Sequence, residues 1–420
     1  MEKIIVKGGT TLSGEVNISV AKNSVLPIIV ASILNPNDIV IKETPFLEDV
    51  EVLTNLLYDS KVQVEKINNN RDLKLNTTNV DPIHLNGELI RKMRASFLVM
   101  GPLLSRFGVC KISMPGGCNI GSRPVDLHLK GFKLLGAEIS IDHGNIEAKA
   151  KKLKGNRIYL DFPSVGATEN LIMAATLAKG TTIIENAAME PEIWDLINFL
   201  NKMGANISED YKNQIIIDGV DELKGIEYMP IYDRVEAATF MVAAAITKSK
   251  IKINGINEEH LRPNIEKLKE CGVKIDIFDN SMIVDGRCDL KPVDIKTMPF
   301  PGFPTDTQSQ MMTLLTLVKG TSVITETVFE NRFMHVSELQ RMGAKIKIDG
   351  RTAIIEGVDS LTGCEVKATD LRAGASMILA GLVAKGQTEV KDIYHIDRGY
   401  VDIENKFINL GADVSRIITE

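Results

Sequence analysis

The chain has 420 residues, of which 44% are hydrophobic and 25% are charged, and its net charge is −6. This length and composition predict a globular protein of two domains, or of three small ones. The acidic balance argues against general nucleic-acid binding, and no apolar run is long enough to span a membrane.

The five cysteines include no Cys-x-x-Cys pair and no Cys/His cluster with zinc spacing. We therefore expect reduced thiols and a cytoplasmic protein. The chain begins with Met1-Glu-Lys-Ile-Ile-Val, which predicts a short strand rather than a signal peptide. The apolar segment at residues 21–34 is too short to span a membrane and contains Lys22, Asn23 and Pro27.

The segment from Ser113 to His128 contains three glycines and two prolines, which exclude a helix or a central strand. Cys118 lies at its centre, and Arg123 follows five residues later. A nearby cation increases the reactive thiolate fraction of a cysteine. The loop could therefore present a nucleophile or proton donor beside an anion-binding group. The alternative is an inert cysteine in an ordinary turn, and we interpret the single histidine His128 as structural.

A repeat extends along the whole chain. Five Gly-Ala-type turns begin at Leu135, Met203, Cys271, Met342 and Leu410, spaced 68, 68, 71 and 68 residues apart. A degenerate sixth copy, Tyr58-Asp-Ser-Lys-Val62, lies 77 residues before the first of them. Such a fixed period indicates repeated structural units.

Each turn follows a segment with apolar residues at helical spacing and precedes an alternating, strand-like run. Each unit also contains a second helix that is apolar on nearly all faces and must be buried. The unit is therefore helix, strand, helix, strand, with extra strands. The natural division of the chain is into two domains of three units each, with the boundary near residues 228–234.

Polar residues precede or begin the buried helices. Asp306 and Asp370 could be simple N-caps, which bind free amide groups. Capping does not explain Lys22, Arg94 or Arg372, because a cation is disfavoured at the positive end of a helix. Either an anion binds there or these cations form ion pairs with protein carboxylates.

Two further arginines, Arg332 and Arg398, are expected to begin amphipathic helices in the same way. The planar fork of arginine favours carboxylate and phosphate ligands. Asp306 follows two prolines in a fixed loop, so its carboxylate could act as a general base towards a substrate hydroxyl.

The loop at 113–128 closely resembles that of the UDP-N-acetylglucosamine 1-carboxyvinyltransferase family of enolpyruvyl transferases. Seven other motifs resemble the same family, in the family's order along the chain: Lys22-Asn23, Met93–Ser96, Ser164–Thr168, Glu185–Glu192, Phe303–Asp306, Phe329–Arg332 and Asp370–Gly374. The combination is specific, although no single motif is.

The resemblance implies an α/β fold of two domains, each an inside-out α/β barrel made of three βαβαββ-type repeats. It implies one domain at residues 1–20 and 232–420, and a second at 21–231 that carries the Cys118 loop. The implied reaction transfers the enolpyruvyl group of phosphoenolpyruvate to the 3′-hydroxyl of UDP-N-acetylglucosamine, releases phosphate and commits the sugar to peptidoglycan synthesis.

By resemblance, Cys118, Asp306, Lys22 and Arg398 are catalytic, and no metal or cofactor is implied. The implied substrate-binding residues are Lys22, Asn23, Arg94, Arg123, Pro124, Val125, Asp126, Leu127, Ser164, Val165, Gly166, Asp306, Val328, Arg332 and Arg372. The alternatives are 5-enolpyruvylshikimate-3-phosphate synthase and a regulatory paralogue that binds the UDP-sugar without catalysis. An RNA-modifying enzyme on a similar fold fits the acidic balance poorly.

Overall fold

The computed structural model describes residues 2–83, 85–116, 125–210 and 214–418. These residues form two compact units. Among the described residues, the continuous unit takes in those from Val20 to Ile231, and the discontinuous unit combines the chain up to Ser19 with the chain from Tyr232 onward. Each unit has a hydrophobic core of its own, as a domain does.

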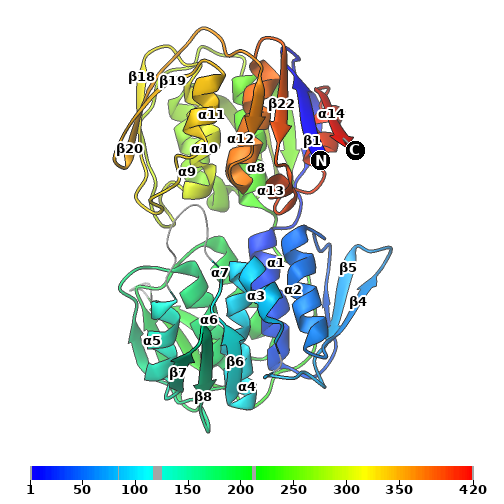
Figure 1. The fold of residues 1–420 in the computed structure, drawn as a ribbon, viewed down its shortest axis with the longest axis vertical. Helices are drawn as coiled ribbons and strands as arrows, with labels where there is room; N and C mark the ends of the chain where they lie inside the picture. The colour runs from blue at the N-terminus through cyan, green and yellow to red at the C-terminus, as the bar shows by residue number, and fades with distance from the viewer. Residues whose placement is uncertain (1, 84, 117–124, 211–213, 419–420) are drawn as a thin grey trace. The chain divides into compact units, whose positions relative to one another are not determined.

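Three helices form the centre of each unit (Figure 1), and nearly all of their residues are buried. They are α1 (Lys22–Ala31), α4 (Met100–Phe107) and α6 (Val165–Thr176) in the continuous unit, and α8 (Arg234–Ile246), α10 (Gln308–Leu315) and α12 (Leu371–Val383) in the discontinuous unit. The short helices η1 (Ser32–Leu34), α3 (Gly87–Lys92), η2 (Arg94–Val99), η3 (Thr305–Thr307) and α13 (Tyr394–Asp397) adjoin them.

A strand and a second, amphipathic helix follow each buried helix. The strands are β3 (Ile39–Ile41), β6 (Val109–Ser113), β10 (Thr181–Glu185), β14 (Lys250–Asn254), β18 (Thr321–Thr325) and β22 (Gln387–Lys391). The amphipathic helices are α2 (Glu48–Asp59), α5 (Asp126–Leu134), α7 (Pro191–Met203), α9 (Glu258–Glu270), α11 (Val336–Arg341) and α14 (Ile403–Asn409).

Antiparallel strand pairs complete the repeats. They are β4 (Gln63–Ile67) with β5 (Asp72–Asn76), β7 (Glu138–Asp142) with β8 (Asn145–Lys149), β11 (Asn206–Asp210) with β12 (Gln214–Asp218), β15 (Lys274–Phe278) with β16 (Ser281–Asp285), β19 (Lys345–Asp349) with β20 (Thr352–Glu356), and β23 (Asp413–Ile418) with β1 (Glu2–Lys7). The edge strands β2 (Ser13–Asn17), β9 (Arg157–Tyr159), β13 (Glu227–Tyr228), β17 (Ile295–Lys296) and β21 (Glu365–Lys367) add a parallel neighbour to five of the sheets.

The described strands form five four-stranded sheets and one three-stranded sheet. In each, the strand after a buried helix lies beside one strand of the antiparallel pair, as in the order β9-β10-β12-β11. Helices thus occupy the interior of each unit, and sheets cover it. The predicted inside-out α/β architecture with six βαβαββ-type repeats is confirmed.

The Gly-Ala turns end the amphipathic helices as expected. The glycines that follow α5, α7, α9, α11 and α14 have φ between 95° and 108°, the left-handed region that glycine adopts without strain. In the degenerate copy, Lys61 takes the same place after α2 with φ 67°. The period in the sequence therefore reflects the turn between each helix and its strand.

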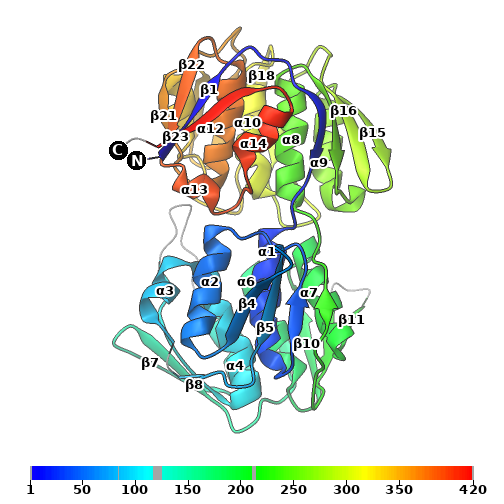
Figure 2. The same ribbon diagram turned by 90° about the vertical axis from the view of Figure 1, so that its right-hand side faces the viewer.

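The N-terminal strand explains why one unit is discontinuous. β1 lies between β22 and β23 and is antiparallel to both, as Figure 2 shows for the blue strand beside the orange and red ones. It supplies the second strand of the antiparallel pair that the sixth repeat would otherwise lack. β2 joins another sheet of the same unit, parallel to β14.

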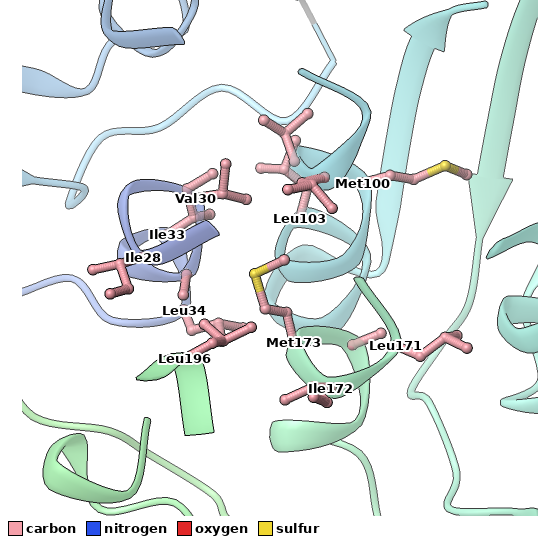
Figure 3. Close-up of a cluster of buried hydrophobic side chains, with 14 of the residues drawn as sticks. Ile28, Val30, Ile33, Leu34, Met100, Leu103, Leu171, Ile172, Met173 and Leu196 are labelled. Carbon is pink, nitrogen blue, oxygen red and sulfur yellow. The ribbon is translucent and has the colours of Figure 1, made fainter. Parts of the chain in front are cut away.

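The core of the continuous unit forms where its buried helices converge. Figure 3 shows side chains of α1, α4 and α6, among them Val30, Leu103 and Met173, directed into one apolar cluster. Gly101 permits the close approach of α4 to α6, because a Cβ there would lie 2.4 Å from the Asn170 carbonyl oxygen. This packing holds together the buried helices near whose starts Lys22, Arg94 and Ser164 lie.

Candidate functional site

Candidate residues of the continuous unit lie at helix starts. Lys22 is the first residue of α1, and Arg94 is the first residue of η2, which leads directly into α4. Ser164 caps α6, where its hydroxyl accepts a hydrogen bond from the Ala167 amide at 3.3 Å. Free amide groups make such starts favourable for anions.

Lys22 forms a buried ion pair. Its Nζ lies 2.8 Å from Asp49 Oδ2, and the two side chains are only 9% and 6% exposed. Asp49 belongs to the first turn of α2, where a carboxylate is favoured by the helix dipole. The ion-pair alternative therefore holds for Lys22, and any bound anion would share this cation with Asp49. The neighbouring Asn23 is exposed.

The start of α1 is held by the buried carboxylate of Asp195, on α7. Asp195 accepts hydrogen bonds from the Ser24 hydroxyl, from the Tyr228 hydroxyl at 2.6 Å and from the Ile231 amide at 3.1 Å. Burial raises the pKa of Asp195, and these donors oppose that effect. Lys22 and Asn23 are thus presented by a rigid helix start.

Three elements of the continuous unit meet at His128. Its Nδ1 lies 3.1 Å from the Asn170 amide nitrogen, which must donate, so the ring proton is on Nε2. Burial, together with the positive charge of Arg94, lowers the pKa of His128 to about 3. A Cβ on Gly166 would lie 3.6 Å from the ring. The structure therefore brings Gly166 close to His128, which is neutral because burial and the charge of Arg94 lower its pKa.

Other predicted residues of this unit lie at the starts of α5 and α6. Val125 is the buried residue before α5, Asp126 is exposed, and Leu127 and Val165 are half-buried. Three predicted residues, Cys118, Arg123 and Pro124, lie outside the described residues.

A group of buried carboxyls was not identified from the sequence. Glu169 on α6 is 5% exposed, and Glu192 on α7 is 4% exposed. Burial, together with the charges of Glu192 and Glu190, raises the pKa of Glu169 well above its ordinary value. An acidic residue inside an otherwise apolar helix was the available signal, because such a residue is costly unless it is neutral or paired.

Glu169→Gln should make the protein more stable than wild type, increasingly so as the pH rises. The unfolded Glu169 ionises near its usual pKa of 4.5, whereas the folded residue keeps its proton to higher pH. As the pH rises above 4.5, the unfolded state is favoured because it loses this proton more easily than the folded state, so wild-type stability falls until the pH passes the raised pKa. Glutamine has no proton to lose, so it removes this pH-dependent loss of stability. Thermal unfolding between pH 5 and 9 measures the difference.

The exposed Glu138→Gln in the same unit is the control, and it should show no such trend. A difference between Glu169→Gln and wild type that stays constant with pH would contradict the prediction.

The discontinuous unit holds Asp306 between two arginines. Arg332 Nη2 lies 2.9 Å from Asp306 Oδ1, and Arg372 Nη2 lies 3.2 Å from Oδ2. The arginine side chains are 4% and 3% exposed, whereas that of Asp306 is 29% exposed. The carboxylate is therefore accessible, while the cations that hold it are buried.

Capping is confirmed for Asp370 but is wrong for Asp306. Asp370 Oδ1 accepts hydrogen bonds from the Arg372 and Ala373 amides at 2.9 and 3.1 Å. Asp306 lies within η3 and directs its carboxylate to the two guanidinium groups instead. The stronger charge-assisted bonds explain the difference.

Arg372 has unused donors. Its Nε and Nη1 are buried and make no hydrogen bond of good geometry with the described residues, although the Tyr400 hydroxyl lies close enough to interact with the guanidinium. The guanidinium also lies over the ring of Tyr400, 5.5 Å from its centroid. Because buried charged donors are costly when unpaired, this arrangement favours an acceptor supplied by a bound anion.

The expectation that Arg332 and Arg398 begin amphipathic helices is wrong. Arg398 is the C-cap of the short helix α13, and Arg332 precedes α11 by several turn residues. The two amphipathic helices that the sequence pattern predicts are present, as α11 and α14, but they begin several residues after these arginines. Val328 is half-buried, and its amide donates to Glu326 Oε1 at 2.8 Å.

Among the residues that the structure describes, no group of three or more His, Cys, Asp or Glu side chains could hold a metal ion. Within the same residues, no helix is both long and apolar enough to cross a membrane.

A family model described as EPSP synthase (3-phosphoshikimate 1-carboxyvinyltransferase) matches residues 6–407. UDP-N-acetylglucosamine 1-carboxyvinyltransferase 1 of Clostridium acetobutylicum is 63% identical over 417 residues, which cover 99% of this chain and 100% of the relative. UDP-N-acetylglucosamine 1-carboxyvinyltransferase 2 of Clostridium tetani has the same identity and coverage. The chain belongs to the UDP-N-acetylglucosamine 1-carboxyvinyltransferase family.

Solved structures of other enolpyruvyl transferases share the fold. The enolpyruvyl transferase NikO from Streptomyces tendae has a TM-score of 0.90 at 23% identity and covers 100% of this chain and 99% of its own. EPSP synthase from Acinetobacter baumannii has a TM-score of 0.76 at 18% identity, with both chains fully covered. At this distance the likeness concerns architecture alone.

Proposed function

We propose that this chain transfers the enolpyruvyl group of phosphoenolpyruvate to the 3′-hydroxyl of UDP-N-acetylglucosamine and releases phosphate. The reaction is the first committed step of peptidoglycan synthesis. The observation that carries the proposal is the 63% identity to UDP-N-acetylglucosamine 1-carboxyvinyltransferases over nearly the whole chain. The same observation argues against the shikimate-directed alternative, although the family model bears that enzyme's description.

The proposed mechanism is addition followed by elimination. Cys118 delivers a proton to carbon 3 of phosphoenolpyruvate and also forms a covalent adduct with this substrate. The sugar hydroxyl adds to carbon 2 while Asp306 takes its proton. Loss of a proton from carbon 3 and of phosphate from carbon 2 then gives the enol ether. The exposed edge of the Asp306 carboxylate supports its role as base.

The substrates together carry three phosphates and a carboxylate, which accounts for cations at positive helix ends. We propose that Lys22, Arg123 and Arg398 hold the phosphate of phosphoenolpyruvate, with Arg332 and Arg372 near the substrate anions. The unused donors of Arg372 support such a contact. Fixed charges of this kind are often the largest catalytic term.

The UDP-sugar would be bound mainly by residues of the continuous unit. We propose the following contacts: Asn23, Arg94, Arg123, Pro124, Val125, Asp126, Leu127, Ser164, Val165 and Gly166, with Asp306 and Val328 from the discontinuous unit. The starts of α5 and α6, where the first helix amides have no acceptor within the helix, support this assignment.

We also propose that the two compact units are the enzyme's domains. One consists of residues 1–20 and 232–420, and the other of residues 21–231.

The proposed reaction requires only small-molecule substrates as partners, with no nucleic acid or membrane. We propose the cytoplasm as its location, because this compartment supplies phosphoenolpyruvate.

Phosphate release from phosphoenolpyruvate and UDP-N-acetylglucosamine tests the proposal, beside a Cys118→Ala variant. Release that needs both substrates and collapses in the variant would support both the reaction and the role of Cys118. Release that persists in the variant would keep the reaction and remove Cys118 from proton donation. No release by wild type, with UDP-N-acetylglucosamine still bound, would favour the regulatory paralogue.

A further inference from the structure

Arg398 is presented by a short turn at the end of α13. The Gly399 and Tyr400 amides both donate to the Ile396 carbonyl, at 3.0 and 3.1 Å. Arg398 lies between the two residues that anchor this turn, Asp397 and Tyr400. The path of the backbone that carries Arg398 therefore depends on what holds these two neighbours.

The Asp397 end is held by Arg416, from the C-terminal strand β23. Arg416 Nη1 and Nη2 donate to the two carboxylate oxygens of Asp397 at 3.0 and 2.6 Å, a bidentate pair. The same guanidinium donates through Nε to Glu404 at 2.7 Å and through Nη1 to Glu2 at 3.0 Å. One side chain thus joins α13, α14 and the two terminal strands.

The Tyr400 end is held inside the unit, where Tyr400 is 2% exposed. Its hydroxyl lies 2.9 Å from Thr239 Oγ1. The Thr239 hydroxyl already donates its hydrogen bond to the Val235 carbonyl, at 2.8 Å. Tyr400 must therefore donate to Thr239. Gln310 Nε2 contacts both the Tyr400 oxygen, at 3.3 Å, and the Asp306 carbonyl, at 3.1 Å.

The turn is also pressed against the start of α12, which carries Arg372. A Cβ on Gly399 would lie 2.6 Å from a methyl carbon of Leu371, and one on Gly374 would lie 2.4 Å from Ile396 Cγ1. Such approaches show that the turn packs directly against the start of α12. The position of the turn therefore depends on this contact as well as on Asp397 and Tyr400.

We infer that Arg416 is a positioning residue for the substrate. Its bidentate ion pair with Asp397 orients Arg398, which carries the charge that faces phosphoenolpyruvate. The inference rests on the proposed function, because it assigns Arg398 to that anion. Lysine at position 416 would keep the charge but could not form the fork.

Arg416→Lys tests the inference. Titration calorimetry should show phosphoenolpyruvate binding weakened roughly tenfold, or about 1.4 kcal/mol, with UDP-N-acetylglucosamine binding unchanged. In turnover, KM for phosphoenolpyruvate should rise more than kcat falls. Arg287→Lys is the matched control, since Arg287 forms a bidentate pair with Asp285 at 2.8 and 2.7 Å in the same unit. It should leave both affinities unchanged.

Asp397→Asn removes the other partner of this ion pair and should weaken phosphoenolpyruvate binding in the same selective way. The double variant should bind phosphoenolpyruvate little more weakly than either single variant. Wild-type affinity for phosphoenolpyruvate in Arg416→Lys would overturn the inference. So would an equal loss for both substrates that accompanies a lowered melting temperature. A wild-type protein that binds phosphoenolpyruvate without releasing phosphate would contradict the proposed function, while the dissociation constants would still decide the role of Arg416.

Discussion

Asp306→Asn is expected to lower kcat about a thousandfold, within the usual range for loss of a general base. Asparagine has nearly the same shape but cannot take the proton of the sugar hydroxyl. It also leaves Arg332 and Arg372, both buried, facing a neutral amide instead of a carboxylate. Initial rates of phosphate release, measured at saturating concentrations of both substrates, provide the test.

Asp285→Asn makes the same chemical change in the same unit, at a carboxylate paired with the exposed Arg287, and should leave kcat unchanged. Melting temperatures of both variants show whether folding contributes. An Asp306→Asn enzyme with kcat within a few-fold of wild type would exclude Asp306 as the base.

The second large effect concerns stability. Lys406→Met is expected to lower the free energy of unfolding by about 3–5 kcal/mol, because it leaves a buried carboxylate without its cation. Glu236 is 2% exposed, forms an ion pair with Lys406 and accepts from the Ser19 amide at 2.7 Å. Lys406 also donates to the Ser19 hydroxyl at 2.7 Å. Urea unfolding at pH 7 measures the loss.

The pH dependence of this effect follows from Glu236. Burial raises the pKa of Glu236, and the nearby Lys406 opposes this shift. Without Lys406 the carboxyl can take up a proton as the pH falls, so the variant should lose less stability at pH 5 than at pH 7.

Two further variants separate the buried charge from the loss of packing. Glu236→Met combined with Lys406→Met should recover part of the stability, because no unpaired charge remains. Lys7→Met breaks an exposed ion pair with Asp413 in the same unit and should cost under about 1 kcal/mol. Equal losses in Lys406→Met and Lys7→Met would contradict the argument.

Local patterns in the sequence predicted the repeated architecture. The Gly-Ala turns marked the ends of five amphipathic helices, and even the degenerate copy at Lys61 adopts the same left-handed turn. These features depend on residues that are neighbours in the chain, so periodicity and turn chemistry are sufficient to find them. The same reasoning placed Lys22 and Arg94 at helix starts, where the structure has them.

Helix boundaries near the arginines were less predictable. Arg398 ends α13 rather than beginning a helix, because the chain forms an additional short turn there before α14. Glu169 and Asp195 were missed because their significance depends on burial, and burial depends on which faces of α6 and α7 pack inward.

The sequence by itself determined the six repeats, the family motifs and the cations at helix starts. Only the tertiary structure decided which charges meet. Asp306 pairs with Arg332 and Arg372, which are 26 and 66 residues away, and Arg416 reaches Asp397 from the last strand. Such pairs depend on how separate repeats pack against one another, and no local spacing encodes that packing.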